Sequence, residues 1–190
     1  LADTMLYTDS STIPNMTYFN TYDASHKIIA SYAFTYQGGN ADSLYKQFFV
    51  YSSGLLTMDS TYQLVGATWH LISKSFYSYN VSSDLVQIDN YANPIDSTYT
   101  KPLVEWFQYI NTYDGGHRML TVNAKQNDGK TLAPYVADTF AYAGPQAFHT
   151  SWKEYQYDGI NKYWAPISYM TKFLNVSGMP EFSNMMSFDS

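Results

Sequence analysis

Aromatic and β-branched residues alternate with small polar residues along most of this chain. Tyr32, Phe34 and Tyr36 are spaced by two, as are Tyr155 and Tyr157. A side-chain period of two is the period of a β-strand. Aromatic and β-branched side chains also fit a pleated, half-buried surface. Segments with the helical period of 3.6 are nearly absent, so the pattern predicts an all-β chain.

A Tyr followed by a turn sequence recurs about every fifteen residues, which is the mark of a repeat architecture. Tyr7, Tyr22, Tyr36 and Tyr51 are separated by 15, 14 and 15 residues. After an irregular middle the same pattern returns at Tyr79, Tyr113, Tyr142 and Tyr157. The turn sequences contain Asn, Asp and Gly, which supply the positive φ angles of tight hairpins.

Together the two patterns predict a long antiparallel meander of about 11–13 strands, built from hairpin repeats of about fifteen residues per strand and turn. A single sheet, curled or flat, is expected. The strands are expected at 14–22, 27–36, 42–51, 55–64, 68–79, 84–92, 98–112, 117–126, 130–142, 147–157 and 162–175.

Three prolines lie in or near these ranges: Pro102, Pro134 and Pro166. Proline cannot donate to a ladder of hydrogen bonds, so each is expected at a strand start, a bulge or an edge. Leu-Ala-Pro at 132–134 and Trp-Ala-Pro at 164–166 match each other. The matching segments indicate that a bulge at the proline is a regular feature of the repeat.

Composition narrows the class of protein. The 190 residues are enough for one domain, 1–190, and because the first residues already lie inside a repeat, it is expected to be a fragment of a longer array. The net charge of −6 and the absence of a basic run argue against a nucleic-acid partner. The absence of Cys rules out disulfides, thiolate zinc sites and Cys nucleophiles. No apolar run reaches the roughly 20 residues of a membrane span.

Several of the turn segments resemble a known repeat. The segments 22–28 (Tyr-Asp-Ala-Ser-His-Lys-Ile), 49–56 (Phe-Val-Tyr-Ser-Ser-Gly-Leu-Leu) and 113–119 (Tyr-Asp-Gly-Gly-His-Arg-Met) are similar to the Tyr-Asp (YD) repeats of Rhs-type proteins. They are most similar to the Tyr-rich repeats of secreted Bacteroidetes surface proteins. The resemblance implies an exported bacterial protein with a structural or adhesive role, secreted or at the cell surface, and it implies no catalytic residues.

The acidic and His residues allow two interpretations. Five Asp fall in turns, where they could bind calcium along one rim or cap turn amides: Asp9, Asp23, Asp114, Asp128 and Asp158. Capping is favoured because Asp side chains accept bonds from nearby backbone amides. His26 and His117 occupy the same place, four residues after the turn Tyr. A role at positive φ is favoured over a metal site, because His tolerates that conformation better than most residues. No metal site and no cofactor are expected.

Motifs for catalysis are absent. The chain has no Gly-x-Ser-x-Gly, no His-Glu-x-x-His and no phosphate-binding Gly loop. Glycoside hydrolysis needs two acids held across a cleft. The three Glu, which are Glu105, Glu154 and Glu181, do not single out such a pair. We therefore expect a protein that is not an enzyme.

The four Trp are the best candidates for ligand binding: Trp69, Trp106, Trp152 and Trp164. Trp69 and Trp164 both come just after a turn. Exposed rings on a sheet could stack on sugar rings, whereas the alternative is that the Trp pack against other side chains, which large aromatics usually do. Exposure of two or more on one face would favour binding.

Three functions follow from these patterns. The favoured one is a non-catalytic extracellular bacterial repeat protein that acts as a scaffold, a spacer or a self-associating surface element, with partners that are neighbouring repeats or like subunits joined at sheet edges, as in a filament. The alternative is a carbohydrate-binding module that holds glycans with its Trp and Tyr. A glycoside hydrolase on a β scaffold is third.

Overall fold

The computed structural model describes residues 2–8, 14–37, 40–92, 99, 101–142, 149–174 and 180–187. Every regular element in these ranges is a β-strand. Their bounds are β1 (Ala2–Thr8), β2 (Pro14–Tyr22), β3 (Ile28–Gln37), β4 (Asn40–Ser52), β5 (Leu55–Val65), β6 (Thr68–Tyr79), β7 (Leu85–Ala92), β8 (Val104–Tyr113), β9 (Met119–Asn127), β10 (Leu132–Ala141), β11 (Ser151–Asp158), β12 (Tyr163–Leu174) and β13 (Pro180–Ser187).

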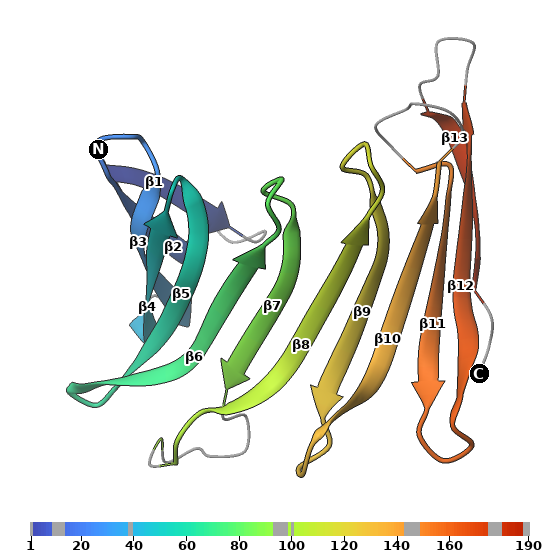
Figure 1. The fold of residues 1–190 in the computed structure, drawn as a ribbon. Coiled ribbons are helices and arrows are strands. Elements are labelled where there is room, and N and C mark those ends of the chain that lie inside the picture. The colour runs from blue at the N-terminus through green and yellow to red at the C-terminus, as the bar shows by residue number, and fades with distance from the viewer. Residues whose placement is uncertain are drawn as a thin grey trace. The chain divides into compact units, whose positions relative to one another are not determined.

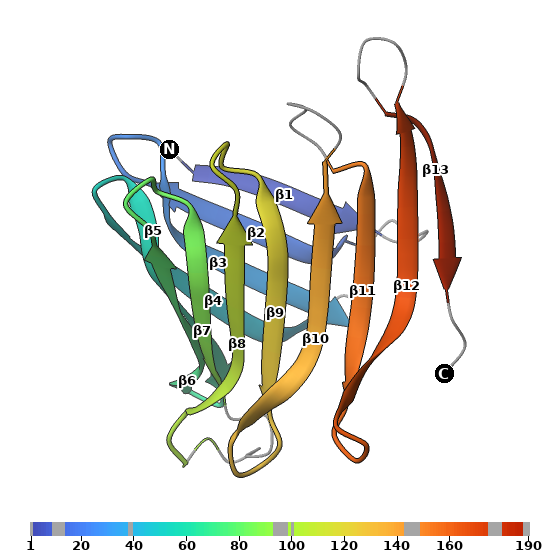
Figure 2. The same ribbon diagram turned by 45° about the vertical axis from the view of Figure 1, so that its right-hand side comes forward.

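The strands follow one another through a single antiparallel sheet in the order β1 to β13. Both views show consecutive strands such as β8, β9 and β10 side by side (Figures 1 and 2). The predicted all-β meander and its strand number are confirmed. The chain packs as two compact units, residues 1–77 with 90–104 and residues 78–89 with 105–190.

Most expected strand ranges agree with the structure within a few residues. The largest difference is the expected strand 98–112, because β8 begins only at Val104. Pro102 explains the late start, since it cannot donate to the ladder. The start of the expected strand 147–157 lies outside the described residues. The strands β1 and β13 were not in the expected ranges and are found at 2–8 and 180–187.

Most hairpins carry one extra residue, and it lies on the strand that follows the turn. Tyr51 faces Leu56 and Val50 faces Met58, so Thr57 is the extra residue of β5. Extra residues give a local bend and a stronger twist. In six hairpins the residue on the turn side of the register shift is a Tyr: Tyr22, Tyr36, Tyr51, Tyr62, Tyr113 and Tyr155.

The proline bulges are confirmed. Pro134 faces Lys125 and Val136 faces Ala124, which leaves Tyr135 as the extra residue. In the same way Pro166 faces Tyr155 and Ser168 faces Glu154, which leaves Ile167 extra. Both prolines therefore precede a bulge on the second strand of a hairpin, as the matching Leu-Ala-Pro and Trp-Ala-Pro sequences predict.

Few side chains are fully enclosed. Of the described residues only Ala30 and Ala124 are buried apolar residues, each 6% exposed. The larger apolar side chains are half-buried or exposed, and several aromatic rings pack in pairs on the sheet faces, as Phe48 does with Tyr62 at 5.9 Å between ring centres. Such cross-strand aromatic pairs contribute roughly 0.2–1 kcal/mol each. The fold is thus held by backbone ladders and facial contacts within each unit.

Candidate functional site

Three turns share one hydrogen-bonding pattern, which we call the Tyr-Asx turn: residues 22–28, 79–85 and 113–119. In the first of them the Asp23 amide donates to the Lys27 carbonyl and the His26 amide donates to the Asp23 carbonyl. The Asp23 carboxylate accepts bonds of 2.8 and 2.9 Å from the amides of Ser25 and Lys27. Asn80 and Asp114 accept equivalent pairs of bonds in the other two turns.

The capping role predicted for the turn Asp residues is confirmed wherever the structure describes them. Asp128 accepts from the amides of Lys130 and Thr131, and Asp158 accepts from those of Ile160 and Asn161. These bonds hold the pKa of both carboxyls below the ordinary value. Asp9 lies outside the described residues. No group of three or more His, Asp or Glu that could hold a metal ion occurs in the described part of the chain.

The predicted positive φ of the two turn His is also confirmed. His26 and His117 both have φ of 63°, and Ser83 has 67° at the same place in the middle turn. His26 is exposed. The His117 ring lies 3.1 Å from the carboxylate of Asp84, so this side chain also connects two neighbouring Tyr-Asx turns of one unit. The first cause of the lowered pKa of Asp84 is its bond from Asn80, followed by its contact with His117.

Each Tyr-Asx turn is fastened by a Tyr at or just beyond the end of the second strand after the turn. The hydroxyl groups of Tyr51, Tyr113 and Tyr142 donate to the carbonyl oxygens of Ile28, Leu85 and Met119, at 3.0, 2.8 and 2.8 Å. In every case the accepting residue is the last residue of the turn, which is also the first residue of a strand. Burial raises the pKa of the Tyr113 and Tyr142 hydroxyls, which keeps them as proton donors. We call this contact the Tyr clamp.

Two of the clamps carry a cation on the Tyr ring. The Lys27 ammonium lies 5.1 Å from the Tyr51 ring centre, and the Arg118 guanidinium lies 4.7 Å from that of Tyr142. Lys27 also donates to the carbonyl of Gly54 at 2.8 Å. In both clamps the cation belongs to the residue just before the one whose carbonyl accepts the Tyr bond. Its side chain therefore lies over the ring of the Tyr that donates to that carbonyl. Cation–π contacts at exposed sites are worth about 0.5–1 kcal/mol.

The four Trp are not gathered into one site. Trp69, in the first unit, has the Lys46 ammonium 4.2 Å from its ring centre. Trp152 donates from Nε1 to the Asp138 carboxylate at 2.9 Å. Trp164 packs against Tyr157 and, at 39% exposed, is the one Trp of the described residues in the exposed class. Trp69 and Trp164 are each the second residue of a strand, as expected.

Trp152 and Trp164 lie on opposite faces of the β11–β12 pair. Trp152 faces Met170, whereas Trp164 faces Tyr157, which is five residues from Trp152 along β11. Side chains an odd number of residues apart on a strand point to opposite faces. Trp106, on β8, packs edge-on against Phe107 at 6.2 Å. Trp152 and Trp164 therefore do not offer their rings together on one face of this strand pair.

The structure brings together two pairs of acids that sequence reasoning missed. Asp138 of β10 and Glu154 of β11 are direct cross-strand partners. Burial, together with the charge of Glu154, raises the pKa of Asp138. Glu154 accepts a 2.6 Å bond from the hydroxyl of Ser168, which is 5% exposed. This pair is the kind of feature that a hydrolase would need, although both acids already bond to neighbours.

The second acid pair is Asp89 and Glu105. The Gln108 amide donates to Asp89 at 2.9 Å and to Glu105 at 3.4 Å. Burial is the first cause of the raised pKa of Glu105, and the charge of Asp89 is the second. The Lys125 ammonium donates to the Gln108 side chain at 3.0 Å and partly offsets the shift. Both pairs depend on strand register, and the signal in the sequence was only that all four acids lie inside expected strands.

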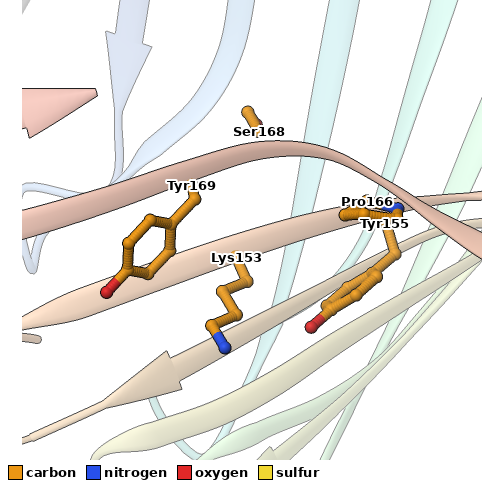
Figure 3. Close-up of a pocket in the computed structure, with 5 residues that line it drawn as sticks. All are labelled: Lys153, Tyr155, Pro166, Ser168 and Tyr169. Atoms are coloured by element: carbon orange, nitrogen blue, oxygen red, sulfur yellow. The ribbon is translucent and has the colours of Figure 1, made fainter. Parts of the chain in front are cut away.

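A hollow of about 460 Å³ lies on the β11–β12 hairpin, lined by Lys153, Tyr155, Pro166, Ser168 and Tyr169. Figure 3 shows the Lys153 side chain between the rings of Tyr155 and Tyr169. A smaller hollow of about 170 Å³ in the first unit is lined by small and polar residues from β2 to β5, including Tyr18, Tyr45 and Gln47. The larger hollow falls within the size range of small-molecule sites.

Comparison with known proteins identifies the fold and no family. No family model matches the chain. No curated protein matches it. A crystal structure of a Bacteroides fragilis protein of unknown function is similar, with a TM-score of 0.53 and 11% identity over 64% of this chain and 87% of the other. That likeness concerns the fold.

Two further crystal structures are of DUF3836 family proteins. The one from Parabacteroides distasonis has a TM-score of 0.36 and 16% identity over 49% of this chain and 90% of its own. The one from Bacteroides vulgatus has a TM-score of 0.33 and 8% identity over 75% of this chain and 98% of its own.

Proposed function

We propose that this chain is a non-catalytic repeat protein that serves as an extracellular bacterial scaffold or spacer, and that copies of it associate through sheet edges. The single observation that carries the proposal is the repeated Tyr clamp. Three turns of the same design are each fastened by a Tyr hydroxyl at or just beyond the end of the second strand after the turn. The most distinctive residues of the chain are therefore used to hold hairpins together.

The turn chemistry supports the same proposal. The acids that could have formed a calcium rim accept bonds from turn amides instead, as Asp114 does from Gly116 and Arg118. His26 and His117 serve the backbone conformation of their turns. A repeat array of this kind offers extended surface rather than one special cleft.

The extracellular placement is supported by composition and by the resemblance to Tyr-Asp repeats. The chain has 20 Tyr and no Cys, and only 14% of its residues are charged. The described residues contain no helix that is long and apolar enough to cross a membrane.

Association through edges is supported by strand order. In the sheet as described, β1 pairs only with β2 and β13 pairs only with β12. The open side of an edge strand presents unpaired amide and carbonyl groups, which can pair with another chain. The partner we propose is a like subunit or a neighbouring repeat.

Sedimentation velocity over a range of concentrations tests this association. Wild-type protein is expected to form larger species as concentration rises. Ser183→Pro and Asn184→Pro change adjacent residues of β13, so one removes an amide that faces β12 and the other removes an amide that faces the open edge. The variant that loses the amide facing the open edge is expected to stay folded and to lose association. The variant that loses the amide facing β12 is expected to weaken the pairing of β13 within the sheet. A wild-type protein that remains monomeric at every concentration would contradict the proposal.

Carbohydrate binding by the Trp is the second candidate, and the exposure of Trp164 is the observation that favours it. Titration with a panel of polysaccharides, followed by Trp fluorescence, tests it. A Trp164→Phe variant should lose any change in emission that comes from this ring. An unchanged spectrum with every polysaccharide would remove this candidate.

A further inference from the structure

The hollow on the β11–β12 hairpin brings together polar groups that are not used by the fold. Lys153 is exposed, and its one contact in the described part of the chain is with the Tyr169 ring, whose centre lies 5.5 Å from the ammonium. The hydroxyls of Tyr155 and Tyr169 make no hydrogen bond to any described residue, unlike those of the Tyr clamps. One cation and two phenol groups therefore remain available in one hollow (Figure 3).

The backbone explains why the hollow forms there. Lys153 faces Tyr169 and Tyr155 faces Pro166, so the four side chains share one face of the hairpin. The extra residue Ile167 lies between the two pairs. A bulge bends its strand and redirects neighbouring side chains. The two Tyr rings are consequently separated along the hairpin, with the lysine between them.

The neighbouring β9–β10 hairpin has the same proline bulge and provides an internal comparison. There Lys125 faces Pro134, and Asn123 faces Ala137 where the other hairpin has Lys153 and Tyr169. The Lys125 ammonium is already bound by the Gln108 side chain at 3.0 Å. The bulge is therefore common to both hairpins, whereas the unbound lysine flanked by Tyr rings belongs to β11–β12.

The charges around Lys153 indicate the sign of a ligand. Its cross-strand partners are Thr139 on β10 and Tyr169 on β12, and its neighbours on the same face of β11 are Ser151 and Tyr155. None of these carries a carboxylate, and Glu154 points to the other face. An anionic group would thus meet an unpaired ammonium, which is a charge-assisted contact.

We propose that this hollow binds a monocarboxylated sugar, a hexuronic acid unit of a glycan. The carboxylate would bind the Lys153 ammonium, the apolar faces of the sugar ring would pack on Tyr155 and Tyr169, and sugar hydroxyls would bond to the two phenols. A highly charged polyanion fits less well because the whole chain carries a net charge of −6. Trp164 lies next to the hollow on the same face of the hairpin but does not line it, and the site does not depend on edge association.

Nuclear magnetic resonance titration of the full chain tests the proposal with three small probes. Methyl β-D-glucuronide carries the carboxylate, methyl β-D-glucoside is its neutral counterpart, and acetate offers a carboxylate without the sugar. The glucuronide is expected to shift the backbone signals of residues 153, 155 and 169. The other two probes should bind at least about tenfold more weakly, since each lacks part of the contacts.

Matched variants assign the contacts. Lys153→Gln should weaken glucuronide binding at least about tenfold, because a charge-assisted hydrogen bond is lost. Lys125→Gln on the neighbouring hairpin should leave it unchanged. Tyr155→Phe and Tyr169→Phe keep the rings and should each weaken binding by about two- to tenfold. Circular dichroism checks that the exposed Lys153→Gln substitution leaves the fold intact.

Several results would overturn the proposal. They are equal binding of the glucuronide and the glucoside, equal binding of the glucuronide and acetate, signal shifts located away from β11 and β12, and unchanged glucuronide binding by Lys153→Gln. Absence of any shift at about 10 mM glucuronide would do the same, since a site with a dissociation constant of about 1 mM would be mostly occupied at that concentration. Failure of edge association would leave these outcomes unaffected, which separates this site from the proposed scaffold function.

Discussion

The Tyr113 hydroxyl donates a 2.8 Å hydrogen bond to the carbonyl oxygen of Leu85, 28 residues earlier in the chain. Leu85 is the first residue of β7, and Tyr113 is the last residue of β8. The same carbonyl accepts a 2.9 Å bond from the Asn111 side chain. Tyr therefore contributes more than a ring that packs on the sheet. At the ends of strands its hydroxyl also makes a specific hydrogen bond.

Removing that hydroxyl tests the clamp. Tyr113→Phe keeps the ring and should lower the free energy of unfolding by about 0.5–1.5 kcal/mol, the usual net worth of one hydrogen bond. Asn111 still satisfies the Leu85 carbonyl, which favours the lower end of that range. Chemical denaturation measures the change. Tyr157→Phe is the matched control, because the Tyr157 hydroxyl makes no hydrogen bond to described residues, and an equal loss in both variants would argue against the clamp.

The positive φ of His26 predicts which residues its turn accepts. His26→Val should lower the free energy of unfolding by about 1–2 kcal/mol, because the left-handed conformation crowds a β-branched side chain. His26→Asn should remain close to the wild type, since Asn tolerates this conformation. Ala24→Val, two residues earlier at a position without positive φ, is the control. A tolerated Val at position 26 would show that the turn can relax.

The Asp114 carboxylate predicts a stability that depends on pH. The bond from the Arg118 side chain is the first cause of its lowered pKa, and the amides of Arg118 and Gly116 add to it. A carboxyl with a lowered pKa in the folded state stabilises the fold above its unfolded pKa, near 3.8, and that stabilisation is lost as pH falls through the folded pKa.

Asp114→Asn separates the charge from the cap. The side-chain oxygen of Asn can still accept the turn amides, as Asn80 does in the sister turn. The variant should therefore unfold at a lower temperature than the wild type at pH 7, with a difference that shrinks as the pH falls from the unfolded pKa through the lowered folded pKa of Asp114. A constant difference across this range would mean that the ion pair with Arg118 is not the cause.

The raised pKa of Asp138 predicts a pH dependence of stability opposite in sign to that of Asp114. Burial and the charge of Glu154 raise its pKa, and the bond from Trp152 only partly opposes them. A carboxyl with a raised pKa in the folded state favours folding below its unfolded pKa, and this contribution is lost as pH rises through the folded pKa. At neutral pH the ionised carboxylate therefore costs stability.

Asp138→Asn should raise the unfolding temperature at pH 7, because the amide is neutral and its oxygen can still accept from Trp152. The gain should disappear as the pH falls below about 3.8, where the wild-type carboxyl is neutral too. Thermal unfolding at pH 7 and pH 3 measures both values. Asp158→Asn serves as the control of opposite sign, because hydrogen bonds lower the pKa of Asp158.

The strands were predictable because local rules determine them. Period-two alternation and turns rich in Asp, Asn and Gly indicate where a hairpin begins and ends, and the proline at 134 and 166 indicated a bulge that is found at both places. The strand β8 shows the limit of this reasoning, because Pro102 shortened a range that alternation alone extended to residue 98.

The acid pair was not predictable because it depends on pairing across a hairpin. Asp138 meets Glu154 only through the register of β10 with β11. A shift of one residue would send one of the two acids to the other face. The hollow at Lys153 likewise requires both the bulge at Ile167 and the pairing of Lys153 with Tyr169. Alternation reveals which residues share a face of one strand, but it does not reveal their partners on the next.

The extra residue that follows most turns has a consequence for how such a chain can evolve. A bulge stores one residue that the ladder does not need, so an insertion or deletion at that point changes the length of a repeat while the pairing beyond it is kept. Repeats can therefore change in length, so that the spacing of the Tyr residues becomes irregular while the hairpins are kept. Weak sequence periodicity is therefore expected of a fold that tolerates insertions and deletions of single residues at its bulges.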